Sequence, residues 1–221
     1  MRAIAIALIV SAAMGAALCR AQVTPVVAKQ REIQDVLDSE GNVVSHTETL
    51  GRYLRNSAGS VVTQTYSTRN NETVIRSGQL EDYSRHKIYQ LSYEKLEAVE
   101  LADLPDRPHP EYLANAKSAL GRETVNGLPC LIHSTYLIAG GEKQLIGKTY
   151  DSAEYGLHIK EDVTFQLSGG PRTHRVVELY DLQFAEPDPK EFELERFAFK
   201  GKGPVVCAKP GSSAAVVEPL K

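Results

Sequence analysis

The sequence predicts a mainly β fold, a strongly curved antiparallel sheet or incomplete barrel with one short helix. Segments rich in Val, Thr, Tyr and Ile recur along the chain, and turns containing Gly, Asn or Ser separate them. Apolar and polar residues alternate over 157–167, as in a strand with one buried and one solvated face. About a dozen strands are expected, and an open sheet of that size normally curls and so creates a concave face.

The first half of the chain contains one series of expected strands. Residues 39–42 and 56–60 combine Gly, Asn and Ser, and residues 70–71 are Asn-Asn, so all three are turn sequences. The strands expected around these turns are 31–38, 43–55, 61–69 and 72–77, with shorter strands within 80–99. The apolar residues of 93–104 fit neither the helical nor the strand period, so this stretch stays unassigned.

A proline-rich segment separates the two halves. Three prolines between Leu104 and Pro110 predict an irregular crossover. Pro110 suits the first turn of a helix, where its missing N–H costs nothing, and Ala114, Ala116 and Ala119 favour helix. The sequence therefore predicts its one short helix over residues 110–119.

The second half has the clearest pattern, an antiparallel meander. Gly140 and Gly141 form a tight hairpin turn, and residues 151–155 and 168–171 are the next turns. The expected strands are 128–138, 143–150, 157–167 and 173–184. Pro187 and Pro189 then close the domain.

The first 21 residues have the layout of a cleavable secretory signal. Arg2 provides a positive charge, residues 3–18 are apolar and uncharged, and small residues stand at Cys19 and Ala21. The pattern predicts cleavage after Ala21 and a periplasmic or secreted mature protein. The apolar run is shorter than the roughly 20 residues of a membrane span, so no transmembrane segment is expected in the mature chain. A lipid anchor on Cys19 is the alternative interpretation.

The remaining chain is expected to form one domain, residues 22–199, followed by a disordered tail, residues 200–221. About 200 residues can bury a core without extra cross-links. The tail contains Gly, Pro, Ser and Ala without periodicity.

Charge excludes one class of partner. The chain has 25 Lys and Arg residues and 28 Asp and Glu residues, a net charge of −3. Basic residues form no stripe that could replace the counterions of a phosphate backbone, so nucleic acid is not an expected partner.

Cleavage of the signal leaves two cysteines, Cys130 at the start of a strand and Cys207 in the tail. An exported compartment permits a disulfide between them, which would hold the tail against the sheet. The alternative is two independent thiols, with Cys130 as a small buried apolar side chain.

Catalytic signatures are missing from the sequence, which contains no nucleophile elbow, HExxH helix, phosphate-binding glycine loop or CxxC pair. We therefore predict a protein that is not an enzyme and needs no cofactor or metal. Hairpin counting does place His133 opposite Lys148, and His158 near both Lys148 and Asp181. A cation between two histidines opposes metal binding, and a slip of one residue moves every side chain to the other face. A solvated polar face is the favoured interpretation, and a hydrolase or metal enzyme is an alternative.

Two segments of the second half resemble a known family. They are Gly-Arg-Glu-Thr-Val-Asn-Gly-Leu-Pro-Cys at 121–130 and Glu-Leu-Tyr-Asp-Leu-Gln-Phe-Ala-Glu-Pro-Asp-Pro-Lys-Glu-Phe at 178–192. With the meander between them, they resemble exported bacterial proteins of the lipoprotein-localisation carrier (LolA/LolB-like) half-barrel superfamily. The resemblance implies an unclosed barrel whose concave side is covered by helices and accepts acyl chains. It carries over no catalytic residues.

These observations lead to a functional hypothesis. We expect an exported, non-catalytic half-barrel that binds an apolar ligand, a lipid or a lipidated partner such as a lipoprotein in the cell envelope. The candidate ligand-lining residues are the apolar row Leu157, Ile159, Val163, Phe165 and Leu167, although the same row suits a packed core. The alternative is an envelope module that docks or senses a protein partner without a small ligand.

Overall fold

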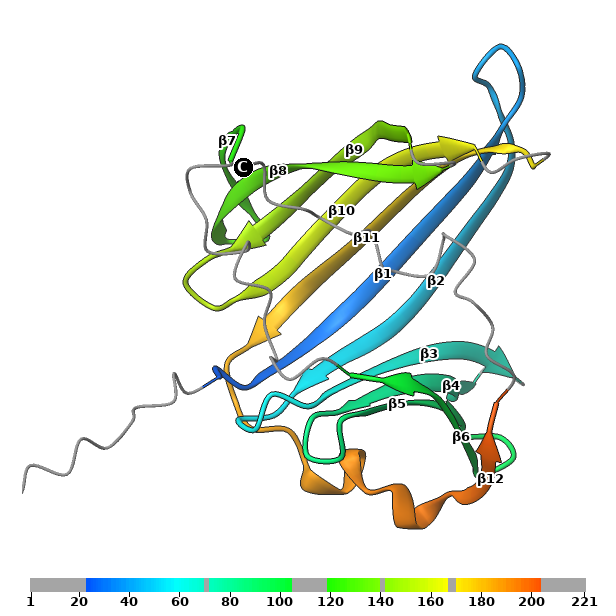
Figure 1. Ribbon diagram of the computed structural model, residues 1–221, viewed down its shortest axis with the longest axis vertical. Helices are drawn as coiled ribbons and strands as arrows, with labels where there is room; N and C mark the ends of the chain where they lie inside the picture. Colours follow the sequence, from blue (N-terminus) through cyan, green and yellow to red (C-terminus); the bar gives the residue numbers. More distant parts are fainter. Residues whose placement is uncertain (1–22, 70–71, 105–118, 140–141, 167–169, 204–221) are drawn as a thin grey trace, which may run out of the picture.

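The structure is a computed structural model that describes residues 23–69, 72–104, 119–139, 142–166 and 170–203. In these ranges the chain forms twelve strands and two short 3-10 helices (Figure 1). The first six strands are β1 (Val26–Leu37), β2 (Val43–Arg55), β3 (Val61–Arg69), β4 (Glu72–Asp82), β5 (Lys87–Ser92) and β6 (Glu97–Asp103). They are followed by β7 (Gly121–Val125), β8 (Leu128–Ala139), β9 (Glu142–Ser152), β10 (Leu157–Gln166), β11 (Arg172–Gln183), η3 (Pro189–Phe192), η4 (Leu194–Arg196) and β12 (Ala198–Lys202).

All twelve strands belong to one sheet, in the order β12-β6-β5-β4-β3-β2-β1-β11-β10-β9-β8-β7. β1 lies in the middle, paired with β2 on one side and β11 on the other. Figure 1 shows that the sheet curves strongly and stays open between its two edge strands. The predicted mainly β, strongly curved antiparallel sheet is confirmed.

β12 departs from the antiparallel expectation, because it pairs in parallel with β6. The chain leaves β11 through η3 and η4 and crosses the sheet before β12 begins, and parallel neighbours require such a crossover. β12 also ends at Lys202, so residues 200–202, expected in a disordered tail, belong to a strand. The rest of that tail, residues 204–221, lies outside the described residues, as does the signal segment before residue 23.

The helices that the structure describes, η3 and η4, lie outside the range in which the sequence predicts a helix. The predicted helix over 110–119 falls on residues 105–118, outside the described part of the chain, except for its last residue. η3 and η4 were not predicted. Asp188 accepts a hydrogen bond from the Lys190 amide at 3.0 Å and Pro189 starts the turn, a combination that favours a helical turn.

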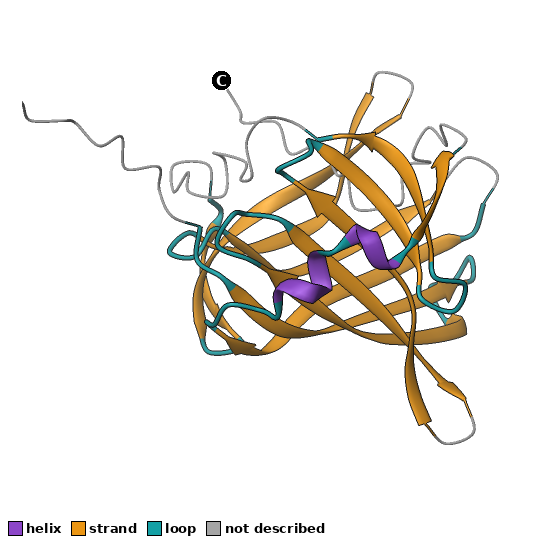
Figure 2. Ribbon diagram, turned by 90° about the horizontal axis from the view of Figure 1, so that it is seen from below, coloured by secondary structure: helices purple, strands orange, loops and turns teal. Residues whose placement is uncertain are grey.

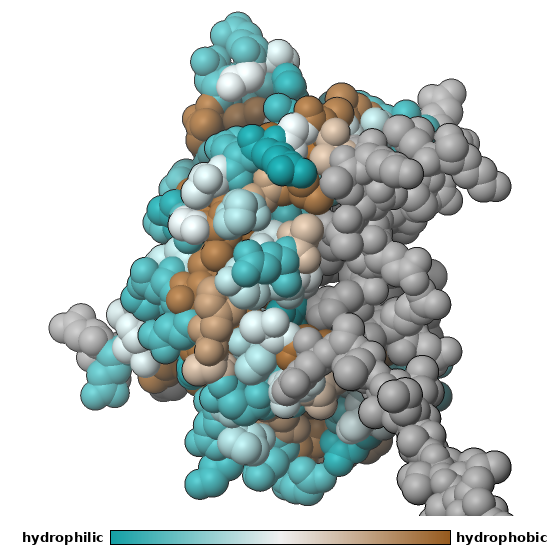
Figure 3. Space-filling view, turned by 90° about the vertical axis from the view of Figure 1, so that its left-hand side faces the viewer, coloured by the Kyte–Doolittle hydropathy of each residue, from teal (hydrophilic) through white to brown (hydrophobic). Residues whose placement is uncertain are grey.

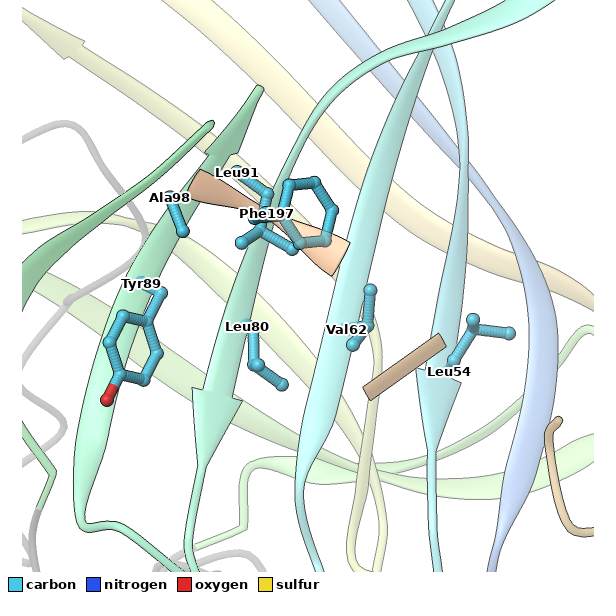
Figure 4. Close-up of a cluster of buried hydrophobic side chains, with 7 residues drawn as sticks. All are labelled: Leu54, Val62, Leu80, Tyr89, Leu91, Ala98 and Phe197. Atoms are coloured by element: carbon cyan, nitrogen blue, oxygen red, sulfur yellow. The ribbon is translucent and has the colours of Figure 1, made fainter. Parts of the chain in front are cut away.

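η3 and η4 cover one face of the sheet, here named the helix-covered face. Leu54, Val62 and Leu80 stand directly opposite one another on β2, β3 and β4, and residues in register share a face. The ring of Phe197, which follows η4, packs against this row (Figure 4). Figure 2 shows the two helices lying across the strands on this side. This cluster is completed by Tyr89, Leu91 and Ala98.

A second buried cluster connects the middle of the sheet to the strands of the second half. It consists of Val26, Ala28, Cys130, Leu157, Ile159 and Leu179, contributed by β1, β8, β10 and β11. Partly buried tyrosines, among them Tyr53 and Tyr150, pack around it. Val26 and Ala28 belong to this cluster, whereas Val27 packs against the first one, because successive side chains of β1 point to opposite faces of the sheet.

Two glycines allow strands to approach closely. A Cβ atom added to Gly51 would lie 2.1 Å from the Gln64 carbonyl oxygen, and one added to Gly147 would lie 2.1 Å from the Asp162 carbonyl oxygen. Glycine inside a strand often marks a sharp bend or such an approach. No helix of the described chain is long and apolar enough to cross a membrane.

Candidate functional site

An open groove with a volume of about 900 Å³ crosses the centre of the sheet. β2 and β3 separate here, since Gly51 opposite Thr65 is the last pair that joins them. The lining residues are Val27, Ala28, Lys29, Leu50, Gly51, Arg52, Tyr66, Tyr180, Asp181, Leu182 and Gln183. Lys29 and Arg52 share the face of Val27 and Leu54 by register, so the groove opens beside η3 on the helix-covered face.

A β-bulge in β11 shapes the groove. Val27 stands opposite Gln183 and Lys29 opposite Tyr180, so β11 has an extra residue between these pairs. Asp181 lies in this bulge with φ 51°, a left-handed conformation that non-glycine residues adopt rarely. Bulges redirect side chains and are frequent beside functional sites.

Each cation of the groove is paired with a carboxylate. Lys29 Nζ lies 2.7 Å from Asp181 Oδ2, and Arg52 Nη1 lies 3.5 Å from Glu191 Oε1 on η3. The hydrogen bond and the negative charge of Asp181 raise the pKa of Lys29, so the ammonium group stays charged at neutral pH. The Lys29 ammonium is also 5.8 Å from the centre of the Tyr180 ring, within the range of a cation–π contact.

The apolar row predicted as a ligand lining is mostly buried. Leu157 and Ile159 are 1% exposed and belong to the second cluster, and Val163 is 2% exposed. Phe165 is half-buried, and Leu167 lies outside the described residues. None of the four described residues lines the groove. Their role as a ligand lining stays a prediction.

Of the two cysteines in the predicted disulfide, the structure describes Cys130. Cys130 is buried in the second cluster, and burial is the largest cause that raises the pKa of its thiol to about 11. Cys207 lies outside the described residues. The pairing of the two cysteines stays a prediction.

The predicted histidine constellation forms with a different carboxylate. His133 stands opposite Thr149 rather than Lys148, and His158 stands opposite Asp151. The hairpin count from Gly140 and Gly141 holds up to Tyr136, where a register shift places an extra residue, Ile146, in β9. Asp181 is instead paired with Lys29.

Asp151 is fully buried between the two histidines. His158 Nδ1 contacts Asp151 Oδ1, while His133 Nε2 lies 3.8 Å from Asp151 Oδ2. Thr149 donates to Asp151 Oδ2 at 3.2 Å. Within the described ranges no group of three His, Cys, Asp or Glu side chains is arranged to hold a metal ion.

The face that bears His133 is polar across several strands. From β8 to β1 the residues directly opposite one another are His133, Thr149, Glu161, Val177 and Glu32. Arg175 lies between two acids of this face, 2.6 Å from Glu32 and 3.2 Å from Glu161. Alternation along β1 puts Glu32 on the face opposite to Val27 and the groove. The groove therefore lies on the face of the sheet opposite to these ion pairs.

Comparison with known proteins gives distant likenesses. No family model matches the chain, and no curated protein matches it. Among solved structures, it is similar to a LolA superfamily protein from Nitrosomonas europaea, with 9% identity over 77% of this chain and 90% of that one, and a TM-score of 0.37. It is also similar to a domain provisionally described as an outer membrane lipoprotein-sorting protein from Vibrio parahaemolyticus. Here the identity is 10%, the coverage 78% of this chain and 90% of that one, and the TM-score 0.25.

Proposed function

We propose that the protein is an exported, non-catalytic binding protein whose groove accepts one amphipathic lipid. The observation that carries the proposal is the groove, an open hollow of about 900 Å³ in which leucine and tyrosine side chains lie beside two cations. Small-ligand sites typically have volumes of roughly 300–1,000 Å³, are mostly apolar and contain few polar groups.

The lining residues divide into two chemical sets. Leu50, Leu182 and the tyrosines Tyr66 and Tyr180 offer apolar area for an acyl chain, and tyrosine suits a site with one apolar and one wet end. Lys29 and Arg52 offer charge-assisted hydrogen bonds to an anionic headgroup, which would replace Asp181 or Glu191 as their partner.

Apolar surface remains accessible on this protein. Leu50 is 45% exposed at the groove. Figure 3 shows an interrupted band of apolar side chains between hydrophilic ones on one side of the molecule. Such exposed surface supports the binding of an apolar group from outside.

Titration with stearic acid carrying an anthroyloxy fluorophore tests the proposal. We expect saturable binding, and Tyr180→Ala should raise the dissociation constant about tenfold, a loss of about 1.4 kcal/mol. The matched control is Tyr136→Ala on β8, where the ring lies 4.3 Å from the Lys143 ammonium and outside the groove. Binding that Tyr180→Ala leaves unchanged would place the lipid elsewhere, and the absence of saturable binding would overturn the proposal.

Export to the cell envelope is the second part of this proposal, and the N-terminal segment supports it. Mass spectrometry of the mature protein should find an N-terminus at Gln22. If the mass instead shows a diacylglyceryl group on Cys19, the protein is anchored to a membrane by a lipid.

A further inference from the structure

β2 has one open edge for more than half of its length. It pairs with β1 from Val43 to Arg55, but with β3 only from Gly51 to Arg55. In the part of the chain that the structure describes, no strand pairs with the other side of residues 43–50. Figure 1 shows the hairpin of β1 and β2 extending at the upper right beyond the strands beside it, so this edge is open to a partner.

The open edge has little of the usual protection, since Glu48 is the one Asp, Glu, Lys or Arg residue within it and its one bulge lies at Val44. Edge strands are normally kept apart by lysine, by proline or by being very short. Residues 43–50 read Val-Val-Ser-His-Thr-Glu-Thr-Leu, with β-branched residues and neither lysine nor proline. Val44 is 62% exposed and Leu50 is 45% exposed. A bulge at Val44, where Val36 pairs with Ser45 and Leu37 with Val43, is the only irregularity in the register between β1 and β2.

The sequence of this edge is complementary to itself. If two copies pair antiparallel about a two-fold axis at Thr47, each residue faces the one at an equal distance on the other side of Thr47. His46 then faces Glu48, Ser45 faces Thr49, and Val44 faces Leu50, each of them twice. Directly opposite side chains share a face, so the pairs bring an imidazole beside a carboxylate, a hydroxyl beside a hydroxyl and an apolar group beside an apolar group. A register centred on Glu48 would instead oppose two carboxylates, which disfavours it.

We propose that the open edge of β2 pairs with the same edge of a second copy, in an antiparallel register centred on Thr47. A two-fold contact of this kind is closed, because it uses the same surface of both subunits and leaves neither edge free. Leu50 also lines the groove, so the contact would bring the partner subunit against its rim.

Analytical ultracentrifugation of the full mature chain tests the proposal. We expect a reversible dimer in the micromolar range. Thr47→Lys should raise its dissociation constant at least tenfold, since two lysines would then face each other on the axis. Thr73→Lys is the matched control, because Thr73 is an exposed strand residue on β4, away from the open edge.

Cross-linking tests the register even if Thr47→Lys impairs folding. Thr47→Cys should form a covalent dimer in air, because directly opposite residues have Cβ atoms close enough for a disulfide. Ser45→Cys alone should not, since it would face Thr49, whereas the double variant with Thr49→Cys should. Monomeric protein at several hundred micromolar, or a dimer that Thr47→Lys leaves intact, would overturn the proposal.

Discussion

Arg55 is a fully buried cation at the end of β2, and backbone carbonyl groups surround it. Its Nε and Nη2 donate to the Thr24 carbonyl at 3.0 and 2.7 Å, and Nη1 and Nη2 donate to Gly156 and Tyr155 at 2.8 and 2.7 Å. The planar guanidinium donates hydrogen bonds to several carbonyl groups in fixed directions, and the compact ammonium group of lysine lacks this geometry. One side chain thereby fastens the segment before β1 and the turn after β9 to β2.

His158 makes the stability of the protein depend on pH. Burial opposes its charge, but the hydrogen bond and negative charge of Asp151, together with Glu161, outweigh burial and raise the pKa of His158 above 6.5. A histidine with a raised folded-state pKa stabilises the fold while protonated. That contribution is complete below the unfolded-state pKa and is lost as the pH rises through the folded-state pKa.

We therefore expect the free energy of unfolding to fall more steeply in the wild type than in His158→Gln as the pH rises above the ordinary histidine pKa of about 6.5. Urea unfolding of both proteins at a series of pH values, followed by circular dichroism, measures the difference. Subtracting one curve from the other removes the contributions of the remaining groups. Parallel curves would show that the contact between His158 and Asp151 does not stabilise the folded state.

At the scale of the elements, Phe197 is the one buried side chain of the segment from η3 to β12. Phe197 is 6% exposed and packs with Leu54, Val62 and Leu80, and its ring meets Tyr93 edge-on at 5.3 Å. Phe197→Ala should lower the free energy of unfolding by about 3–5 kcal/mol, the usual cost of truncating a buried phenylalanine. Urea unfolding measures the loss.

Phe199 supplies the control for this experiment. It lies on β12, two residues after Phe197, but is 58% exposed. Phe199→Ala should cost less than about 1 kcal/mol, because a half-exposed ring loses little burial. Equal losses for the two variants would mean that η3 and η4 do not depend on the contact between Phe197 and the sheet.

Strands were predictable because their signals are local. Turn residues and alternation placed β2, β3, β8 and β10 close to their observed bounds. Registers were not predictable to the residue, since the extra residue Ile146 in β9 shifts His133 from Lys148 to Thr149 and no sequence pattern marks it. η3 did have a local signal, the Asp188-Pro189 start, although the prolines at 187 and 189 predicted only the end of the domain.

The candidate site had no local signal. Lys29, Arg52 and Tyr180 come from β1, β2 and β11, and only long-range pairing brings them together. The bulge at Asp181 decides which side chains of β11 face the groove, and the separation of β2 from β3 opens it. Both are properties of register, which is why the sequence pointed to the alternating row of β10 instead.

At the scale of the whole molecule, the pairing of β1 with β11 joins the two halves of the chain. Val27 stands opposite Gln183 in this pair, so its contacts span most of the sequence. Apart from this pair and the parallel pair of β12 with β6, the sheet is built from strands that follow one another in the chain. Loop closure over such a distance slows folding, since entropy is lost before the contacts form.

Gly51 and Gly147 are the two glycines at which the strands of the sheet approach each other most closely. At Gly51 an added Cβ would overlap the Gln64 carbonyl oxygen at 2.1 Å, so β2 or β3 would have to move apart at the point where the groove opens. We expect Gly51→Ala and Gly147→Ala each to lower the free energy of unfolding by about 1–3 kcal/mol, the usual cost of overpacking. Gly121→Ala is the control, because the nearest atom to its added Cβ, Ile132 Cδ1, lies 3.9 Å away in ordinary contact. Gly121→Ala should change the free energy of unfolding by no more than about 0.5 kcal/mol. Urea unfolding of the three variants separates the two groups, and a Gly51→Ala protein as stable as Gly121→Ala would mean that the sheet does not need this close approach to curve.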